Sequence, residues 1–218
     1  RQGFNSASGA RESAEVAAMN RENTSARRAP LRTAPAIDAQ RARGQALGPL
    51  AGVPYAVKNL FDVQGEVTLA GSKLNRRHAP ATADAVLIQR LQAAGAVLVG
   101  SLNMDEYAYG FTTENTHYGP CRNPHDLTRS AGGSSGGSGA AVAAGQVPFT
   151  LGSDTNGSIR VPASLCGVWG LKPTFGRLPR SGSYPFVHSI DHLGPFADSV
   201  RSLARVYDVL QGPHAGDP

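Results

Sequence analysis

The sequence predicts an α/β fold, in which helices and strands alternate along the chain and pack in layers. Three observations support this prediction. The chain has 218 residues, of which 40% are hydrophobic, and this is enough for one substantial globular domain. Short apolar runs bounded by glycine, proline or a charge are typical of buried strands. Between these runs lie segments with helical spacing of their apolar residues, so helix and strand units follow one another.

The first strand is expected at 52–58 (GVPYAVK), an apolar run that Gly and Pro introduce and a charge ends, so Lys58 lies at a strand end. Thr82 is expected to cap a helix that stops at Gly95 and precedes a strand at 96–99. The apolar residues of this helix recur at three and four positions: Val86, Leu87, Leu91 and Ala94.

The second unit pairs a small-residue helix at 139–144 with a strand at 147–151, and the third pairs a turn after Ser158 with a strand at 168–171. A last amphipathic helix is expected at about 199–210. Its apolar face consists of Val200, Leu203, Val206, Tyr207 and Leu210.

Charge and composition divide the chain into a poorly ordered basic lead-in, residues 1–30, and a second part, residues 31–218. Residues 1–45 hold eight arginines and four acids, whereas residues 46–218 hold thirteen bases and twelve acids. A solvated arm explains the basic segment better than nucleic-acid binding does, so no nucleic-acid partner is expected.

The chain shows no apolar run of membrane-spanning length and no apolar signal core, so no membrane contact and a cytoplasmic location are expected. Cys121 and Cys166 have neither disulfide-framework nor zinc-site spacing, and we expect reduced, structural thiols. His188 and His192 flank Asp191 and would suggest a metallo-hydrolase, but no third ligand is evident. Structural or surface histidines are favoured, and no metal or other cofactor is expected.

The stretch 132–139 (GGSSGGSG) allows three interpretations. A flexible linker is disfavoured because an expected helix and strand follow directly. A phosphate-binding loop is disfavoured because Ser138 and Gly139 stand where Lys and Ser/Thr are required. The third is the nucleophile elbow of an α/β-hydrolase, around Ser134 or Ser135. An elbow follows a strand directly, and the polar segment 125–131 is not expected to form one, so this interpretation is the runner-up.

The chemistry is expected in the segment 152–162 (GSDTNGSIRVP), a run of small and turn-forming residues between a strand and a helix. Such a turn can aim several backbone N–H groups at one point. If residues 155–158 do this, they form an oxyanion hole beside the hydroxyl of Ser158. That arrangement is the electrostatic half of acyl-transfer catalysis.

Together these segments resemble the amidase signature family. The resemblance rests on Val57-Lys58, 132–138 and 152–162, and it extends from Leu50 to about Gly212. It implies an α/β/α sandwich around a mixed sheet. Because family members are considerably longer, the chain is expected to be the N-terminal half of that domain.

Family members use a serine nucleophile, a second serine held by a cis peptide bond, and a lysine on a strand, with the two serines 24 positions apart. The resemblance implies Ser158 as nucleophile, Ser134 as bridging serine and Lys58 as base, and Ser134 and Ser158 are also 24 positions apart. It also assigns supporting residues. The implied oxyanion segment is Thr155, Asn156, Gly157 and Ser158, and Ser135 is implied as a supporting hydroxyl.

An ordinary lysine, with a pKa of about 10.4, is protonated near neutrality and cannot accept a proton. The site must therefore lower the pKa of Lys58, and burial does this by disfavouring the charged form. An isolated lysine at a strand end is more often a surface residue. The match of all three triad positions outweighs that alternative.

Ala108 and Tyr109 align with a pocket-lining stretch of family members, although Tyr109 is almost as well explained as a core residue. Asp154 and Arg160 flank Ser158 and are expected to pair and brace its loop.

Four segments, 57–62, 69–72, 103–115 and 154–158, look most like the 1-carboxybiuret hydrolase branch of the family. That resemblance implies deamination of a small ureido-carboxylate in s-triazine breakdown, with a small helical partner subunit in a homo- or hetero-oligomer. The alternatives are a general amidase and the A subunit of a glutamine-hydrolysing amidotransferase. The non-enzymatic alternative is an inactive scaffold subunit, which the retention of the whole triad disfavours.

Overall fold

The computed structural model describes residues 28–217 and has a five-stranded mixed sheet at its centre. β1 pairs in parallel with β2 and β7, while β9 runs antiparallel to both β7 and β8. The predicted mixed sheet is therefore confirmed. In spatial order the strands are β2 (Val97–Leu102), β1 (Pro54–Lys58), β7 (Phe149–Asp154), β9 (His192–Ala197) and β8 (Trp169–Gly170).

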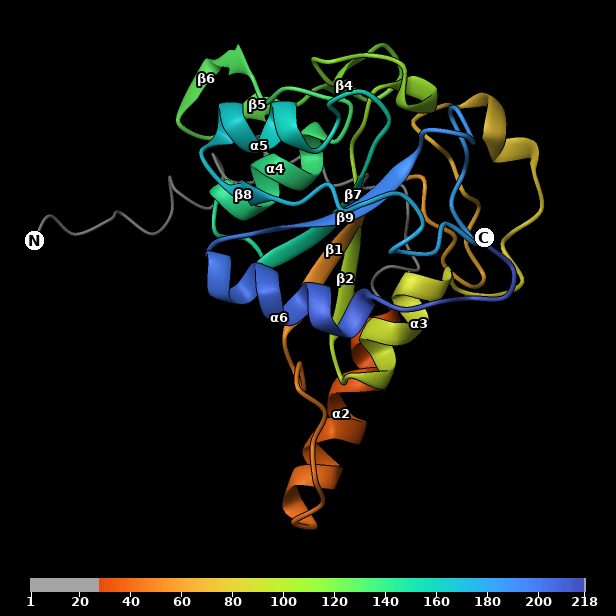
Figure 1. Ribbon diagram of the computed structural model, residues 1–218, viewed down its shortest axis with the longest axis vertical. Helices are drawn as coiled ribbons and strands as arrows, with labels where there is room; N and C mark the ends of the chain where they lie inside the picture. Colours follow the sequence, from red (N-terminus) through yellow and green to blue (C-terminus); the bar gives the residue numbers. More distant parts are fainter. Residues whose placement is uncertain (1–27, 218) are drawn as a thin grey trace, which may run out of the picture.

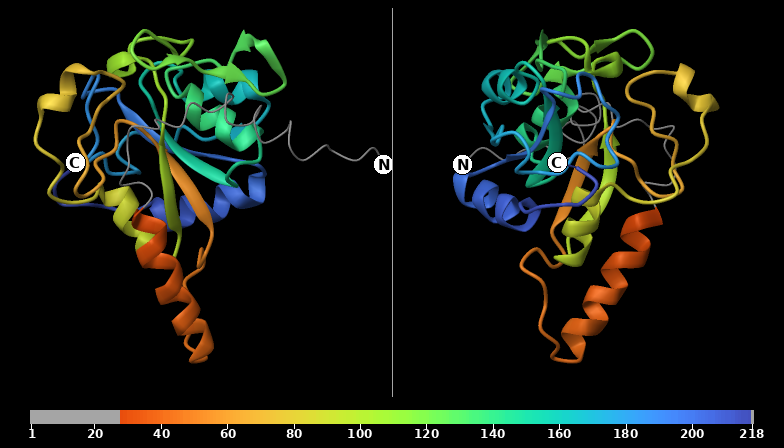
Figure 2. Two further views of the ribbon diagram at one scale, coloured as in Figure 1. Left: turned by 180° about the vertical axis from the view of Figure 1, so that it is seen from behind. Right: turned by 45° about the vertical axis from the view of Figure 1, so that its right-hand side comes forward.

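Helices cover both faces of the sheet (Figure 1), as the α/β/α prediction requires. α4 (Gly136–Ala143) and α5 (Arg160–Cys166) lie on one face, and α3 (Val86–Ala93) and α6 (Val200–Leu210) lie on the other. α2 (Arg28–Ala42) contacts β2 and extends away from the body, as the two views of Figure 2 show.

Alternation of side chains along the strands divides the core into two layers. Tyr55 and Val57 of β1 belong to the cluster under α3 and α6, whereas Ala56 between them packs with Ala141 of α4. The rings of Tyr55 and Phe149 stack between the parallel strands β1 and β7, with their centroids 5.2 Å apart. The parallel strands therefore lie in the buried core between the two helical layers.

Among the predicted elements, α6 is confirmed, with the Ser199 hydroxyl accepting a hydrogen bond from the Ser202 N–H at its start. Val200 was wrongly placed on its buried face, since 54% of Val200 is exposed. The cap at Thr82 was also wrong. α3 begins at Val86 without a side-chain cap, because the Val86 N–H donates to the carbonyl of Ser181 in a neighbouring loop.

The predicted boundaries shift where the glycine-rich and serine-rich segments take regular structure. α4 begins at Gly136 rather than 139, and β7 begins at Phe149 and continues through Ser153 to Asp154. β2 runs to Leu102 instead of ending at residue 99. These longer strands carry polar side chains to the carboxyl edge of the sheet.

The segment 125–131, predicted not to be a strand, contains β6 (Asp126–Ser130). It forms an exposed antiparallel hairpin with β5 (Arg122–Asn123) outside the central sheet. The exposed polar side chains of β6 give no sign of a strand in the sequence, because this strand is held by its backbone hydrogen bonds to β5. The remaining short elements are β3 (Glu114–Asn115), β4 (Gly119–Pro120), η2 (Leu74–Arg77) and η3 (Glu106–Ala108).

Residues 1–27 of the expected lead-in lie outside the described residues, and residues 28–30 form the start of α2. Between residues 28 and 217, no helix combines the length and apolar character needed to cross a membrane.

Candidate active site

The residues predicted for the site meet at the carboxyl edge of the parallel strands. β1 ends at Lys58 and β7 ends at Asp154, and the glycine-rich loop before α4 lies against both. Because neighbouring parallel strands end at the same edge of a sheet, residues distant in sequence converge there.

Lys58 is completely buried. Its Nζ lies 2.6 Å from Ser134 Oγ and 2.9 Å from Ser153 Oγ. Burial lowers the pKa of Lys58 to about 7, although the charges of Asp105, Asp154 and Asp191 act in the opposite direction. A substantial fraction of the amine is therefore neutral near pH 7, as a proton acceptor requires.

Ser134 follows a cis peptide bond from Gly133, as the family resemblance implied. Its carbonyl accepts hydrogen bonds from the Asp105 N–H at 3.2 Å and from the Thr113 hydroxyl at 3.4 Å. Thr113 Oγ1 also accepts the N–H of Gly136 at 3.0 Å. Asp105 and Thr113 thus hold the loop through the Ser134 carbonyl, while Lys58 contacts the Ser134 hydroxyl.

Ser135 is buried and bonded to β7, so its hydroxyl is not presented as that of an elbow nucleophile. Its Oγ donates to the carbonyl of Ser153 at 3.1 Å, and its N–H donates to the carbonyl of Ser158 at 3.3 Å. Gly152 permits this approach, since a Cβ there would meet Ser135 Oγ at 2.9 Å. Ser135 therefore joins the glycine-rich loop to the turn that carries Ser158.

Ser158 is 4% exposed and lies at the end of the turn between β7 and α5. Within residues 28–217, its hydroxyl makes no hydrogen bond to Ser134, although the Ser135–Ser158 backbone bond holds the two segments together. The Gly157 N–H donates to Asp154 Oδ1 at 2.7 Å, so this member of the expected oxyanion segment has a protein acceptor.

Asp154 and Arg160 pair as expected, with Arg160 Nη2 at 2.9 Å from Asp154 Oδ1 and Arg160 Nε at 3.0 Å from Asp154 Oδ2. Asp154 also accepts the N–H of Ile159 at 3.0 Å. Burial raises the pKa of Asp154, but the bonds from Arg160 and from backbone N–H groups outweigh it and hold this pKa below its ordinary value. Asp154 is a charged brace for the turn.

The other two residues of the turn differ in their surroundings. The Thr155 hydroxyl donates to the buried carboxylate of Asp191, which also accepts the N–H groups of Phe186 and Val187. The Asn156 side chain is exposed. The turn is therefore anchored at one residue and open to solvent at the next.

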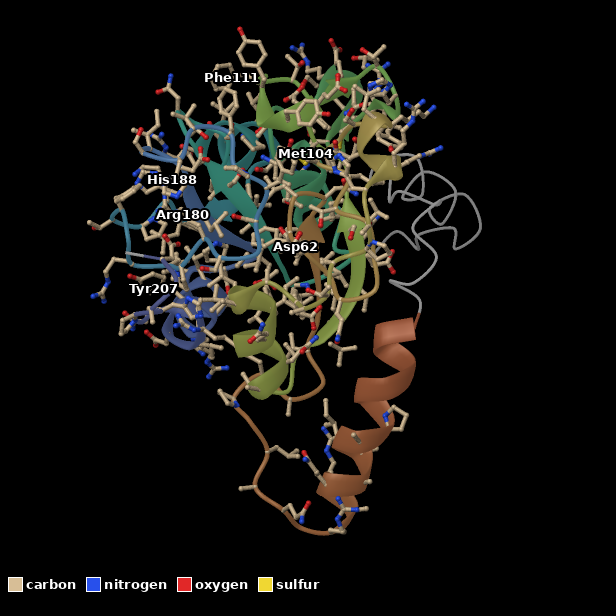
Figure 3. The ribbon with its side chains drawn as sticks, turned by 90° about the vertical axis from the view of Figure 1, so that its right-hand side faces the viewer. Asp62, Met104, Phe111, Arg180, His188 and Tyr207 are labelled. Atoms are coloured by element: carbon tan, nitrogen blue, oxygen red, sulfur yellow. The ribbon has the colours of Figure 1, made fainter. Side chains whose placement is uncertain are left out.

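Ala108 is buried, with φ +62°, whereas Tyr109 is 80% exposed, so the interpretation of Tyr109 as a core residue was wrong. The Tyr109 ring lies 5.7 Å from that of Phe186. Phe111, half exposed, projects outward at the same end of the molecule (Figure 3), and a Cβ on Gly157 would lie 3.4 Å from its ring. The half-exposed ring of Phe111 thus borders the Ser158 turn.

His188 and His192 do not form a metal-binding pair with Asp191. His188 lines a cavity of about 180 Å³ beside Arg180, and His192 Nδ1 lies 2.7 Å from the carbonyl oxygen of Ile190. In the part of the chain that the structure describes, no three His, Cys, Asp or Glu side chains are grouped as metal ligands. Cys121 and Cys166 are both buried and, within the described residues, neither forms a disulfide.

Sequence reasoning missed four polar residues that hold the site together: Ser153, Asp105, Thr113 and Asp191. Burial raises the pKa of Asp105 above its ordinary value, partly offset by the N–H of Thr113 and the charge of Lys58. The only signal for these residues was their position in segments that resemble the family.

Comparison with known proteins identifies the family of the chain. The model of the Amidase family matches residues 10–218. The chain is 78% identical over 185 residues to AtzE, a 1-carboxybiuret hydrolase subunit of Pseudomonas sp. strain ADP, covering 85% of this chain and 40% of that protein. It is 53% identical over 179 residues to the A subunit of the glutamyl-tRNA(Gln) amidotransferase of Anaeromyxobacter dehalogenans strain 2CP-C, covering 82% of this chain and 36% of the relative.

A solved structure, described as a vestigial protein complex that reveals the evolutionary origins of an s-triazine catabolic enzyme, is also similar. It superimposes with a TM-score of 0.84 at 78% identity, over 84% of this chain and 40% of that chain. The chain therefore spans about 40% of the length of these relatives. The family model covers nearly the whole chain, and the chain belongs to the Amidase family.

Proposed function

We propose that the complete protein hydrolyses an amide C–N bond through an acyl-enzyme, with Ser158 as nucleophile, Ser134 as proton bridge and Lys58 as base. The observation that carries this proposal is the 2.6 Å contact between Lys58 Nζ and Ser134 Oγ in a buried site that lowers the pKa of Lys58 to about 7. A neutral amine at this position can accept the Ser134 proton.

In the first half-reaction, Ser134 passes its proton to Lys58 and takes the proton of Ser158. The Ser158 oxygen attacks the amide carbon, and rotation of its side chain toward Ser134 completes the relay. The carbonyl oxygen becomes an oxyanion beside the 155–158 turn, where backbone N–H groups other than that of Gly157, which donates to Asp154, stabilise the charge. When the C–N bond breaks, the proton returns through Ser134 to the leaving nitrogen, which departs as ammonia or an amine.

In the second half-reaction, water attacks the acyl carbon and gives its proton to the same relay. The bond to Ser158 breaks, the oxygen of Ser158 regains a proton, and a carboxylic acid is released. This sequence is a serine–lysine variant of the catalytic triad logic. Asp154 and Arg160 act as a brace that keeps the turn in place during both steps.

We propose a small ureido-carboxylate, such as 1-carboxybiuret, as substrate. One support is the 78% identity to AtzE, which is named for 1-carboxybiuret hydrolysis. The other is the exposed Asn156 amide on the turn, which can hydrogen-bond a small polar substrate. Ala108 and Tyr109 are proposed to line the substrate side of the site. Glutamine is the alternative substrate, because the amidotransferase relative is 53% identical.

We also propose that the protein works in an oligomer, with a small helical partner, and acts in the cytoplasm. The relatives support this, since both are named as subunits and the similar solved structure is described as a protein complex. The two buried cysteines, which form no disulfide within the described residues, accord with a reducing compartment.

Ammonia release from 1-carboxybiuret, biuret, glutamine and a simple aliphatic amide tests the substrate proposal in the full-length protein. The expected order of kcat/KM places 1-carboxybiuret first. A preference for glutamine would replace the ureido-carboxylate by the amidotransferase substrate, and no release from any amide would contradict hydrolysis.

A further inference from the structure

The surroundings of Lys58 include a second hydroxyl that the Ser134–Ser158 relay does not use. Lys58 Nζ lies 2.9 Å from Ser153 Oγ, nearly as close as to Ser134 Oγ. Ser153 is 5% exposed and belongs to β7, a different segment from the glycine-rich loop. Two buried hydroxyls therefore flank one amine.

A neutral amine has two N–H donors and a single lone pair. If Ser134 is to give its proton to Lys58, the lone pair must point at Ser134, and an N–H must then point elsewhere. Ser153 Oγ is the acceptor at that second position. A hydrogen bond there restrains rotation about the last bond of the lysine side chain.

Ser153 is itself held in place by the rest of the site. Its carbonyl accepts the Ser135 hydroxyl at 3.1 Å, and its N–H donates back to Ser135 Oγ at 3.3 Å. On its other side it pairs with Leu193 of β9. The acceptor thus stands on a paired strand of the central sheet, between β9 and Ser135 of the glycine-rich loop.

We infer that Ser153 is a positioning residue, which accepts a hydrogen bond from Lys58 and so directs the lone pair of the amine toward Ser134. This inference rests on the proposed function for its catalytic consequence, but its geometric part concerns Lys58 alone. The charged groups around Lys58 are Asp105, Asp154 and Asp191, and none of them is altered by a change at Ser153.

The inference predicts that Ser153→Ala lowers the pKa of Lys58. A hydroxyl acceptor stabilises the ammonium form more than the neutral amine, since hydrogen bonds to charged groups are the stronger ones. Losing it should lower the pKa of Lys58 further, from about 7 by about one unit. If Ser153 only filled space, its removal would admit water and raise the pKa of Lys58 toward its ordinary value.

The titration can be measured directly in the full-length protein by selective ¹³Cε labelling of lysine and NMR. The Lys58 signal is the one that is absent in Lys58→Met. Ser153→Ala should move its midpoint down by about one pH unit. Ser153→Thr, which keeps the hydroxyl, should leave the midpoint unchanged, and Ser153→Cys, a weaker acceptor of similar size, should move it partway.

Ser138→Ala is the matched control. Ser138 is also a buried serine bonded to β7, through the Leu151 carbonyl at 3.0 Å, but it has no contact with Lys58. It should leave the Lys58 midpoint in place. An unchanged or raised midpoint in Ser153→Ala and Ser153→Cys would overturn the inference.

Labelling of Ser158 by a serine-directed phosphonate at pH 9 then separates orientation from ionisation, because Lys58 is neutral in every variant at that pH. In the full-length protein, Ser153→Ala should label at least about tenfold more slowly than wild type, and Ser153→Thr should label at nearly the wild-type rate. Equal labelling rates in all three proteins would overturn the orienting role. Absence of Ser158 labelling in wild type would instead contradict the proposed function, while the titration would still decide the contact between Ser153 and Lys58.

Discussion

Lys58 shows how a single residue acquires a function from its surroundings. Its amine is buried at the end of β1, and desolvation moves its pKa from 10.5 to about 7 despite three nearby carboxylates. The identity of Lys58, Ser134 and Ser158 as candidates was predictable from the sequence, because each stands in a short segment typical of the family. Ser153 and Thr113 were not predictable, because their contacts join segments 95 and 21 positions apart.

The pH–rate profile follows from the Lys58 pKa. Below about pH 7 the amine is protonated and cannot accept the Ser134 proton, so the rate should rise about tenfold per pH unit and level off above about pH 7. Lys58→Ala should lose activity by orders of magnitude and abolish this limb. Double mutation of His188 and His192 to Ala should leave the limb in place, and its loss there would assign the ionisation to histidine.

Stability should depend on the same group in a predictable direction. Lys58 titrates near 7 in the folded state and near 10.5 when unfolded, so between these values the unfolded chain binds more protons and folding becomes more favourable as pH rises. Lys58→Met removes the free-energy cost of deprotonating and burying this amine. Urea denaturation should show the variant more stable than wild type at pH 7, with the difference narrowing toward pH 10. A difference that did not change with pH would contradict the burial of the amine.

At the scale of elements, the loop 132–135 depends on neighbours that its own sequence does not specify. Thr113, with φ +51°, contributes the hydroxyl that accepts the Gly136 N–H and contacts the Ser134 carbonyl. α6 was predictable because its apolar residues and its cap are local. α2 and β9 were missed, since Pro35 and Pro195 interrupt patterns that tertiary contacts complete.

Thr113→Val tests this coupling, because valine keeps the branched shape and removes only the hydroxyl. The buried Gly136 N–H would lose its acceptor, so the free energy of unfolding should fall by about 1–3 kcal/mol. Ser134 would also lose a support, and phosphonate labelling of Ser158 should slow. Thr113→Ser retains the hydroxyl and should restore most of both properties. Equal stability of the two variants in urea would rule out the proposed support.

At the scale of the whole molecule, the described residues form a central sheet between helical layers, and the carboxyl edge of this sheet carries the candidate site. The α/β/α arrangement was predictable from alternating elements together with the family resemblance. The place of β9 between β7 and β8 was not, because antiparallel pairing between strands about 40 positions apart leaves no local signal.

Every residue assigned to the candidate site lies beyond residue 53, so residues 1–27 are expected to take no part in the chemistry. Deleting them should leave the rate of ammonia release by the full-length protein within about twofold of wild type, because changes far from the site and the core usually have small effects. The same comparison at low and high salt concentration controls for the loss of the positive charge that the deleted segment carries. Loss of turnover after this deletion would show that the basic segment is part of the functional unit.

The most direct test of the serine–lysine mechanism is the site of covalent labelling in the full-length protein. A serine-directed phosphonate, followed by intact mass and peptide mapping, should add one label to Ser158 in wild type. The label should be absent in Ser158→Ala, strongly slowed in Lys58→Ala and Ser134→Ala, and still present in Ser135→Ala. A label that persisted in Ser158→Ala and disappeared in Ser135→Ala would contradict the mechanism and assign the nucleophile to the glycine-rich loop.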